Sequence, residues 1–331
     1  MKFSTPIHID KPDFSIQPLE EMLFVGSCFA DGIGRRFEEE KFKVVVNPFG
    51  TMYNPVSVMH TIQRVDKIPR VLFITLGTNH VYVLKETGEI VDNCQKRPAS
   101  LFEERALTVD ECAHALEQCV ALARKRNPDV RVVLTVSPIR YAKYGFHGSQ
   151  LSKATLLLSV DRVVRTMNVG YFPAYELVLD ELRDYRFYAP DMLHPSPQAV
   201  EYIFERLSES FLSDGARRFI DEWRPVKEAL AHRPLHPDSP EYLAFMEKTK
   251  QQAQQLIDKY PGLDIPLPSL SKDAPLPSLS KDAPLPSCSK DSLLPSLSKD
   301  SLLPSFSKDS LLPSFSKGGA GVVCEKNPPI P

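Results

Sequence analysis

Two stretches of the sequence carry the residue types that nucleophilic catalysis needs. Ser27 and Cys28 follow the apolar run MLFVG, and either a hydroxyl or a thiol can attack a carbonyl carbon once a base activates it. Asp191 and His194 lie three residues apart in the segment APDMLHPSP. A histidine that acts as a general base needs its far ring nitrogen held by a carboxylate or a carbonyl, and an aspartate in the same turn can hold it. The two stretches therefore predict a nucleophile, a base and the partner that orients the base.

Other loops offer groups that can hold the negative charge formed in such an attack. A helix that starts directly after the first stretch leaves free backbone N–H groups at its beginning. In the loop NPFGTMYNP, Gly50 allows close approach of a ligand to the backbone, and Asn47 or Asn54 can fix the loop. Gly77 opens the segment Gly-Thr-Asn, in which Asn79 supplies a side-chain amide donor. The expected oxyanion or substrate-binding residues are Gly50, Gly77, Asn54 and Asn79.

These loops follow segments that alternate between strand length and helical period, which is typical of a parallel sheet covered by helices on both faces. The expected strands span residues 22–26, 42–46, 71–77, 130–138 and 169–175. The expected helices lie near 31–40, 54–65, 108–126 and 150–168, and a hairpin is expected over 80–91. Because ligands bind at the carboxyl ends of the strands in such sheets, we expect the candidate residues to meet at one sheet edge.

Two helix starts are marked in the sequence. Thr108 and Glu111 form a capping-box pattern before an apolar helical face. Ser196 can cap the helix that follows HPSP, and Pro197 suits its first position. Residues 214–260 are expected to form a helical extension of the domain.

Composition and charge exclude several classes of protein. The chain has 331 residues, and 40 basic against 42 acidic side chains give a net charge of −2, which leaves no basic field for a nucleic-acid partner. No run of about 18 apolar residues can span a bilayer, and the polar start is unlike a secretory signal, so we expect a cytoplasmic protein without a membrane partner. The six cysteines show no metal-ligand spacing, so we expect reduced thiols, with Cys112 and Cys119 buried on one helix face.

A nine-residue unit recurs from Pro266 onward, beginning with two copies of PLPSLSKDA. Each copy contains proline, serine and lysine but too few apolar side chains to offset the entropy lost on ordering. We therefore expect one folded domain over residues 1–260 and a disordered tail over 261–331 that has no catalytic role.

With these motifs together, the sequence resembles the GSCFA family, which takes its name from the motif present here at residues 26–30. The similarity covers roughly residues 1–250 and includes MLFVGSCFADGIG, NPFGTMYNP, ITLGTNHVY and DMLHPSP. That family looks like a branch of the GDSL/SGNH hydrolase superfamily. The resemblance implies a three-layer α/β/α sandwich with a central, mostly parallel sheet, and an esterase or acyl-transfer activity.

The resemblance also implies roles for individual residues. It matches the Gly-Asp-Ser nucleophile block to Gly26-Ser27-Cys28, the oxyanion glycine to Gly50, the Gly-x-Asn block to Gly77-Thr78-Asn79, and the Asp-x-x-His block to Asp191 and His194. One departure concerns the nucleophile, because an alignment without gaps puts Ser27 on the aspartate and Cys28 on the serine. Either the register slips by one residue and Ser27 attacks, or this branch uses the thiol, which a helix N-terminus and a nearby histidine would activate.

Two functions stay open from the sequence. The first is an esterase, acyl hydrolase or acyltransferase that acts on a small-molecule or carbohydrate acyl ester and needs no metal or organic cofactor. The second is a non-catalytic ligand-binding or scaffold domain of the same fold with a partner-recruiting tail, which the departure from Gly-Asp-Ser favours. An enzyme needs its nucleophile within hydrogen-bond reach of His194, whereas a binding module does not.

Overall fold

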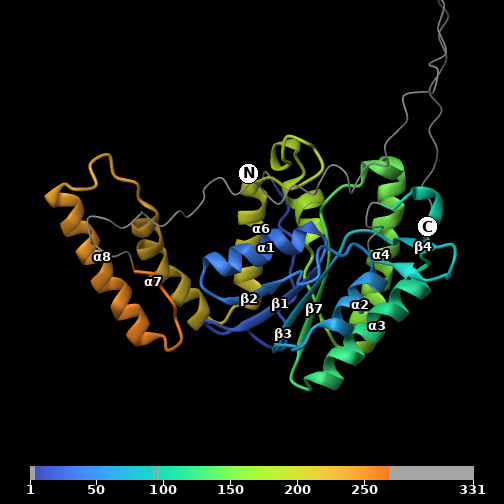
Figure 1. Cartoon of the computed structure of the whole chain (residues 1–331), viewed down its shortest axis with the longest axis horizontal. Helices are drawn as coiled ribbons and strands as arrows, with labels where there is room; N and C mark the ends of the chain where they lie inside the picture. Colours follow the sequence, from blue (N-terminus) through green and yellow to red (C-terminus); the bar gives the residue numbers. More distant parts are fainter. Residues whose placement is uncertain (1–3, 93, 95–96, 268–331) are drawn as a thin grey trace, which may run out of the picture. The chain divides into compact units, whose positions relative to one another are not determined.

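The centre of the molecule is a five-stranded parallel sheet (Figure 1). A computed structural model describes residues 4–92, 94 and 97–267, and it orders the strands β2-β1-β3-β7-β8. The strands are β1 (Glu21–Gly26), β2 (Lys43–Val46), β3 (Val71–Leu76), β7 (Arg131–Val136) and β8 (Gly170–Tyr171). All six residues of β3 are buried, as expected for a central strand that is covered on both faces.

The last strand is shorter than predicted. The prediction of a strand over 169–175 is wrong beyond Gly170–Tyr171, whereas the other four strands are confirmed. Pro173 has no N–H for a ladder bond, so the chain leaves the sheet there. It continues as the short helix α5 (Ala174–Glu176) and the π-helical segment η3 (Leu177–Leu182).

Helices cover both faces of the sheet and complete three layers (Figure 1). The helices around the sheet are α1 (Cys28–Glu39), α2 (Pro55–Arg64), α3 (Val109–Arg126), α4 (Gly145–Met167) and α6 (Pro197–Phe211). On one face, Phe37 of α1 and Phe204 of α6 join Phe24 of β1 in an apolar cluster. On the other face, Leu116 of α3 joins Val25 of β1 in a second cluster, to which α2 and α4 contribute. The predicted α/β/α sandwich is therefore confirmed.

Both predicted helix starts are confirmed. The hydroxyl of Thr108 accepts the N–H of Glu111 at 3.2 Å, and the carboxylate of Glu111 accepts the N–H of Thr108 at 2.8 Å. Ser196 accepts a backbone N–H of the first turn of α6 at 3.2 Å. Helix α4 was predicted from residue 150 but begins at Gly145, where no side chain caps it, so the sequence carries no start signal at that point.

The predicted hairpin belongs to a separate, antiparallel sheet of three strands. Strand β4 (His80–Leu84) pairs with β5 (Ile90–Val91) and also with β6 (Phe102–Ala106), which sequence analysis did not predict. Four of the five residues of β6 are exposed, so the segment FEERA lacks the apolar alternation that marks a strand.

Residues 214–260 contain two helices, α7 (Asp214–Ala231) and α8 (Pro240–Lys259). The indole N–H of Trp223 donates to the carbonyl of Glu39 at 3.0 Å, which ties α7 to the end of α1. The ring of Phe219 in α7 packs edge-on against Tyr260, with 4.8 Å between the ring centroids. The extension is therefore anchored on the helical layer formed by α1.

Other sequence expectations concern the thiols and the tail. Cys112 and Cys119 are fully buried, as predicted. Burial raises the pKa of Cys112 to about 12, and it also raises the pKa of Cys119.

The repeats that begin at Pro266 lie almost wholly in residues 268–331, outside the described residues. In the described part of the chain, no helix combines the length and apolar character needed to cross a bilayer.

The capping box of α3 generates a first prediction. Thr108→Ala removes the oxygen that accepts the Glu111 N–H, and we expect it to lower the free energy of unfolding by about 1 kcal/mol. Thr166→Ala, at an exposed position inside α4, is the matched control and should cost nothing, because alanine is the better helix former there. Urea unfolding of the three proteins measures both values, and equal stabilities would contradict the role of the cap.

Candidate active site

The site begins where β1 ends, at Gly26. This residue has a φ of +139°, and a Cβ built on it would lie 1.9 Å from the carbonyl oxygen of Thr75 in β3. Only glycine can therefore occupy the position. The close approach brings the N–H of Ser27 to 3.0 Å from the hydroxyl of Thr75 and to the same distance from its carbonyl oxygen.

Ser27 serves as the N-cap of α1. Its hydroxyl lies 3.1 Å from the Thr75 hydroxyl and accepts the N–H of Phe29 at 3.3 Å. The residue is 1% exposed. Its oxygen is thus buried and engaged with the end of β3 and with the first turn of the helix.

Cys28 is the first residue of α1 and is partly exposed. Its sulfur lies 3.4 Å from the hydroxyl of Tyr53. The first turn of a helix carries backbone N–H groups without intrahelical partners, and the helix dipole favours negative charge there. The sulfur of Cys28, unlike the buried hydroxyl of Ser27, is therefore partly exposed at the positive end of the helix dipole.

Asp191 and His194 form the predicted pair. One carboxylate oxygen of Asp191 lies 2.6 Å from Nδ1 of His194, and the other accepts the N–H groups of Leu193 at 2.9 Å and of His194 at 3.0 Å. Burial opposes ionisation, but the backbone N–H bonds from His194 and Leu193 lower the pKa of Asp191 below its usual value. The carboxylate thus fixes the ring and leaves Nε2 for another partner.

The loop that carries this pair is fastened to the segment after β7. The backbone N–H of Arg140 donates to the carbonyl of Leu193, and its guanidinium donates to the carbonyl of Met192, both at 3.0 Å. The guanidinium also lies 4.0 Å from the centroid of the Phe146 ring. Because β7 ends at Val136, these bonds hold the Asp191–His194 loop at the carboxyl edge of the sheet.

The starts of α1 and α6 lie at this same edge (Figure 1). A Cβ on Gly32, about one turn into α1, would lie 3.9 Å from the methyl groups of Val200, about one turn into α6. Further along both helices, the rings of Phe37 and Phe204 have centroids 5.0 Å apart. The contacting residues come later in α1 as they come later in α6, so the two helices run parallel. The two nucleophile candidates begin one helix, and the Asp-His pair directly precedes the other.

The loop 47–55 is bonded to the end of β1. The side-chain oxygen of Asn47 accepts the N–H of Gly26 at 2.8 Å, and the N–H of Met52 donates to the Gly26 carbonyl at 2.8 Å. Gly50 has a φ of +90° and donates its N–H to the carbonyl of Asn47 at 2.8 Å. Asn54 caps α2 by accepting a backbone N–H at 2.9 Å. The N–H of Gly50 and the side chain of Asn54, which sequence analysis predicted to bind a substrate, therefore form hydrogen bonds within the loop and the helix start instead.

The segment after β3 is also closely bonded. The N–H groups of Gly77 and Thr78 donate to the carbonyl of Tyr53 at 2.8 and 2.9 Å. The side-chain NH₂ of Asn79 donates to the carbonyl of Leu107 at 2.6 Å, and Asn79 is 4% exposed. Its amide thus fastens the segment before β4 to Leu107, which lies 28 residues away in sequence.

Side chains of α4 hold these loops in roles that the sequence motifs do not predict. The hydroxyl of Ser149 accepts the N–H of Tyr141 at 3.1 Å, and the hydroxyl of Ser152 accepts the N–H of Asn79 at 3.1 Å. Residues three and four apart share one face of a helix. The polar residues Ser149, Ser152 and Lys153 in HGSQLSKA have this spacing, which could have indicated a polar helix face.

Lys153 on the same face is the most deeply buried charge-bearing side chain of the site. Its Nζ donates to the carbonyls of Gly77 at 2.6 Å and Ser137 at 2.8 Å, which follow β3 and β7. The residue is 2% exposed, and burial lowers the pKa of Lys153 to about 7. The amine therefore joins the carboxyl ends of two neighbouring strands.

Two protein-family models match this chain. The model of the GSCFA family matches residues 21–70 and 67–207, and that of the GSCFA domain protein C-terminal domain matches residues 223–266. The chain belongs to the GSCFA family. No curated protein matches the sequence of this GSCFA chain.

Several solved structures are similar to the GSCFA chain at low identity. A member of the lipolytic protein G-D-S-L family from Veillonella parvula is 14% identical, with 58% of this chain and 97% of that chain covered and a TM-score of 0.39. A GDSL-like lipase from Bacteroides thetaiotaomicron is 16% identical, with 59% and 89% covered and a TM-score of 0.39. A catalytic mutant of an acetylxylan esterase from Geobacillus stearothermophilus is 16% identical, with 60% and 98% covered and a TM-score of 0.39.

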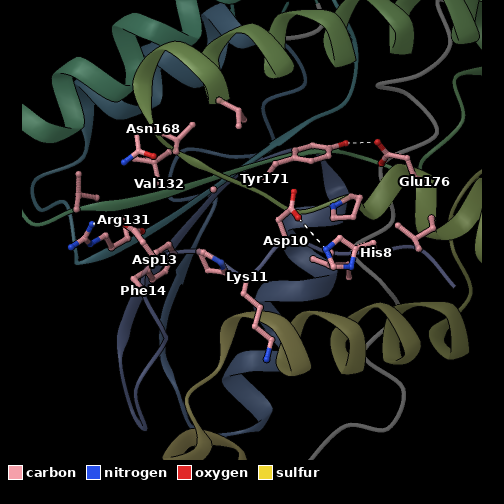
Figure 2. Close-up of a pocket in the computed structure, with 18 of the residues that line it drawn as sticks. His8, Asp10, Lys11, Asp13, Phe14, Arg131, Val132, Asn168, Tyr171 and Glu176 are labelled. Atoms are coloured by element: carbon pink, nitrogen blue, oxygen red, sulfur yellow. Dashed lines mark hydrogen bonds and ion pairs between the residues drawn. The ribbon is translucent and has the colours of Figure 1, made fainter.

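The GSCFA chain also has a cavity of about 450 Å³ away from these residues, between the segment 7–14 and the β8 edge (Figure 2). Figure 2 shows Tyr171 directed toward Glu176, whose carboxylate accepts its hydroxyl at 2.6 Å. None of the predicted site residues lines this cavity. In the described residues, no group of three or more His, Cys, Asp and Glu side chains is arranged to hold a metal ion.

The contact at Gly26 generates a second prediction. Gly26→Ala should lower the free energy of unfolding by more than about 3 kcal/mol or prevent folding, because β1 and β3 must separate to admit the methyl group. Gly88→Ala is the matched control, since Gly88 also has a positive φ but meets nothing within 4 Å, and it should cost only about 1–2 kcal/mol. Denaturant unfolding compares the two, and a smaller loss at Gly26 than at Gly88 would refute the close contact.

Lys153 generates a third prediction. Folded Lys153 loses its proton near pH 7, whereas the unfolded residue keeps it up to about 10.5, so the unfolded chain holds one proton more between these values. The free energy of unfolding should therefore rise with pH in this window, by at most about 1.4 kcal/mol per pH unit. Lys153→Met should remove this rise in urea titrations.

The control for that titration is Lys143→Met. Hydrogen bonds to Glu104 and Tyr82 outweigh burial and raise the pKa of Lys143, so its own proton release falls above the window. The variant should keep the wild-type slope. A slope that is unchanged in Lys153→Met, or lost in both variants, would contradict the assignment to Lys153.

Proposed function

We propose that this GSCFA protein is an esterase or acyltransferase in which Cys28 attacks an acyl carbonyl, His194 moves the proton and Asp191 orients His194. The observation that supports the proposal most is the 2.6 Å contact between Asp191 and Nδ1 of His194. A partly exposed thiol begins α1, which follows the carboxyl end of β1 directly. A carboxylate on one ring nitrogen prepares the other nitrogen to take a proton from a nucleophile.

The environments of the two adjacent candidates favour Cys28 over Ser27. The Ser27 hydroxyl is buried, and its contacts with Thr75 and Phe29 would have to break before it could reach a substrate. Cys28 is not the N-cap of α1, and its side chain is partly exposed. A thiol is also the easier group to ionise, with an unperturbed pKa of about 8.5 against a hydroxyl that stays protonated in water.

In the proposed reaction the proton of Cys28 first passes to Nε2 of His194. The sulfur then bonds to the acyl carbon as the carbonyl electron pair moves to the oxygen. The bond to the leaving alcohol then breaks, the alcohol takes the proton from His194, and a thioester remains. Water, or a second alcohol in a transfer, attacks the thioester and gives its proton to His194. The C–S bond breaks, and the sulfur recovers that proton.

The backbone N–H of Cys28, at the start of α1, is the proposed oxyanion donor, because the helix dipole favours negative charge at that end. Gly50, Asn54, Gly77 and Asn79 keep a substrate-binding role in the proposal through the loops that they shape. The substrate class proposed is a small-molecule or carbohydrate acyl ester. The scheme uses no metal or organic cofactor.

Hydrolysis of p-nitrophenyl acetate tests this function. We expect Cys28→Ala and His194→Ala to lower turnover by about 10²-fold or more, because each removes a group of the proton-transfer step. Ser27→Ala should lose stability as a cap but keep turnover in its folded fraction.

Cys94→Ala is the control, because Cys94 is another partly exposed thiol of the described chain. Turnover that survives Cys28→Ala and disappears in folded Ser27→Ala would reassign the nucleophile to the serine. Wild-type protein without turnover would favour the non-catalytic binding domain, a function that the internal bonding of Gly50 and Asn79 also fits.

A further inference from the structure

A tyrosine of the segment NPFGTMYNP lies in contact with the proposed nucleophile. The hydroxyl of Tyr53 lies 3.4 Å from the sulfur of Cys28, in a contact where either atom can donate. We propose that Tyr53 is a further catalytic residue, which donates its hydroxyl proton in a hydrogen bond to the thiolate of Cys28. This inference rests on the proposed function, because it assigns a role within the same site.

Contacts of its backbone and of its ring hold Tyr53 in place. The Tyr53 carbonyl accepts the N–H groups of Gly77 and Thr78, which fixes its backbone on the end of β3. Its ring packs edge-on against Tyr141, with 6.0 Å between centroids and 85° between ring planes. Lys153 in turn holds the Gly77 carbonyl. The phenol is thus set toward the sulfur by a rigid frame before any substrate binds.

The direction of the hydrogen bond follows from the charge on sulfur. A thiol can donate to the phenol oxygen, but a thiolate can only accept, so ionisation turns Tyr53 into the donor. A hydrogen bond to an ionised acceptor is roughly twice as strong as a neutral one. In reference compounds a phenol ionises about 1.5 pH units above a thiol, so the thiol is the group that ionises first in such a pair.

Tyr53 exchanges no proton in this role. The proton of Cys28 goes to Nε2 of His194, and the negative charge on sulfur passes to the acyl oxygen as the C–S bond forms. The Tyr53 hydrogen bond therefore favours the ion pair that precedes attack. The other ionisable group on this turn of α1 is Asp31, whose carboxylate accepts the side-chain NH₂ of Asn47 at 2.8 Å. Asp191 lies in the loop before α6 and contacts His194.

The test is the pH dependence of alkylation of Cys28 by iodoacetamide, followed by the mass of the peptide that contains Cys28. Tyr53→Phe keeps the ring and the backbone contacts and removes only the hydroxyl. We expect the midpoint of the rate profile to move up by about one pH unit, so that alkylation at about pH 6 slows roughly tenfold while rates at high pH converge. Tyr242→Phe in α8 is the matched control and should leave the profile unchanged.

An unchanged midpoint in Tyr53→Phe would overturn the inference, since the hydroxyl would then only fill space. A midpoint that moves down would also overturn it, because the phenol would then accept from the thiol and hold it protonated. Ester turnover in the same preparations separates the two proposals. If the wild type turns over ester but the midpoint of alkylation is unchanged in Tyr53→Phe, only this inference is defeated. If the midpoint moves up in Tyr53→Phe but the wild type does not turn over ester, the proposed function is defeated and the hydrogen bond is established.

Discussion

The arrangement of the site depends on one contact, the approach of β1 to β3 at Gly26 and Thr75. The absence of a side chain at Gly26 allows the two strand ends to come so close that a Cβ would lie 1.9 Å from the Thr75 carbonyl oxygen. Thr75 can then bond both the N–H and the hydroxyl of Ser27, which sets Ser27 as the cap of α1. Because the cap is fixed, the next residue, Cys28, must be the first of the helix. A serine and a cysteine that are neighbours in sequence thus acquire opposite environments.

Side-chain hydrogen bonds help to hold the carboxyl edge of the sheet. Strand ends leave backbone carbonyls and N–H groups that must find partners if they are buried. Here a side chain supplies the partner in several places: Asn47 for Gly26, Ser152 for Asn79 and Lys153 for two carbonyls. The cost is a buried amine with a lowered pKa, and it accounts for the pH-dependent stability expected of the fold.

The fold could be predicted from the sequence wherever a local signal exists. Continuous apolar runs predicted four strands, and the Thr108 and Ser196 caps marked their helices. Strand β6 was missed because its residues are exposed and charged, and β8 was overextended because Pro173 was not weighed. The pairing of Asp191 with His194 is local and was predicted. The duties of Ser27, Asn79 and Lys153 depend on partners 48, 28 and 76 residues away, which no single-sequence pattern contains.

The central claim is that a thiol at the start of α1 carries the acyl group, and its most direct test is to find that group. The protein is mixed with an activated acetyl ester, quenched in acid and digested, and the acetylated residue is located by peptide mass spectrometry. The account predicts a thioester on Cys28 in the wild type and none on Cys28 in His194→Ala. An acetyl group on Ser27, or a wild type in which Cys28 is labelled no faster than in His194→Ala, would contradict it.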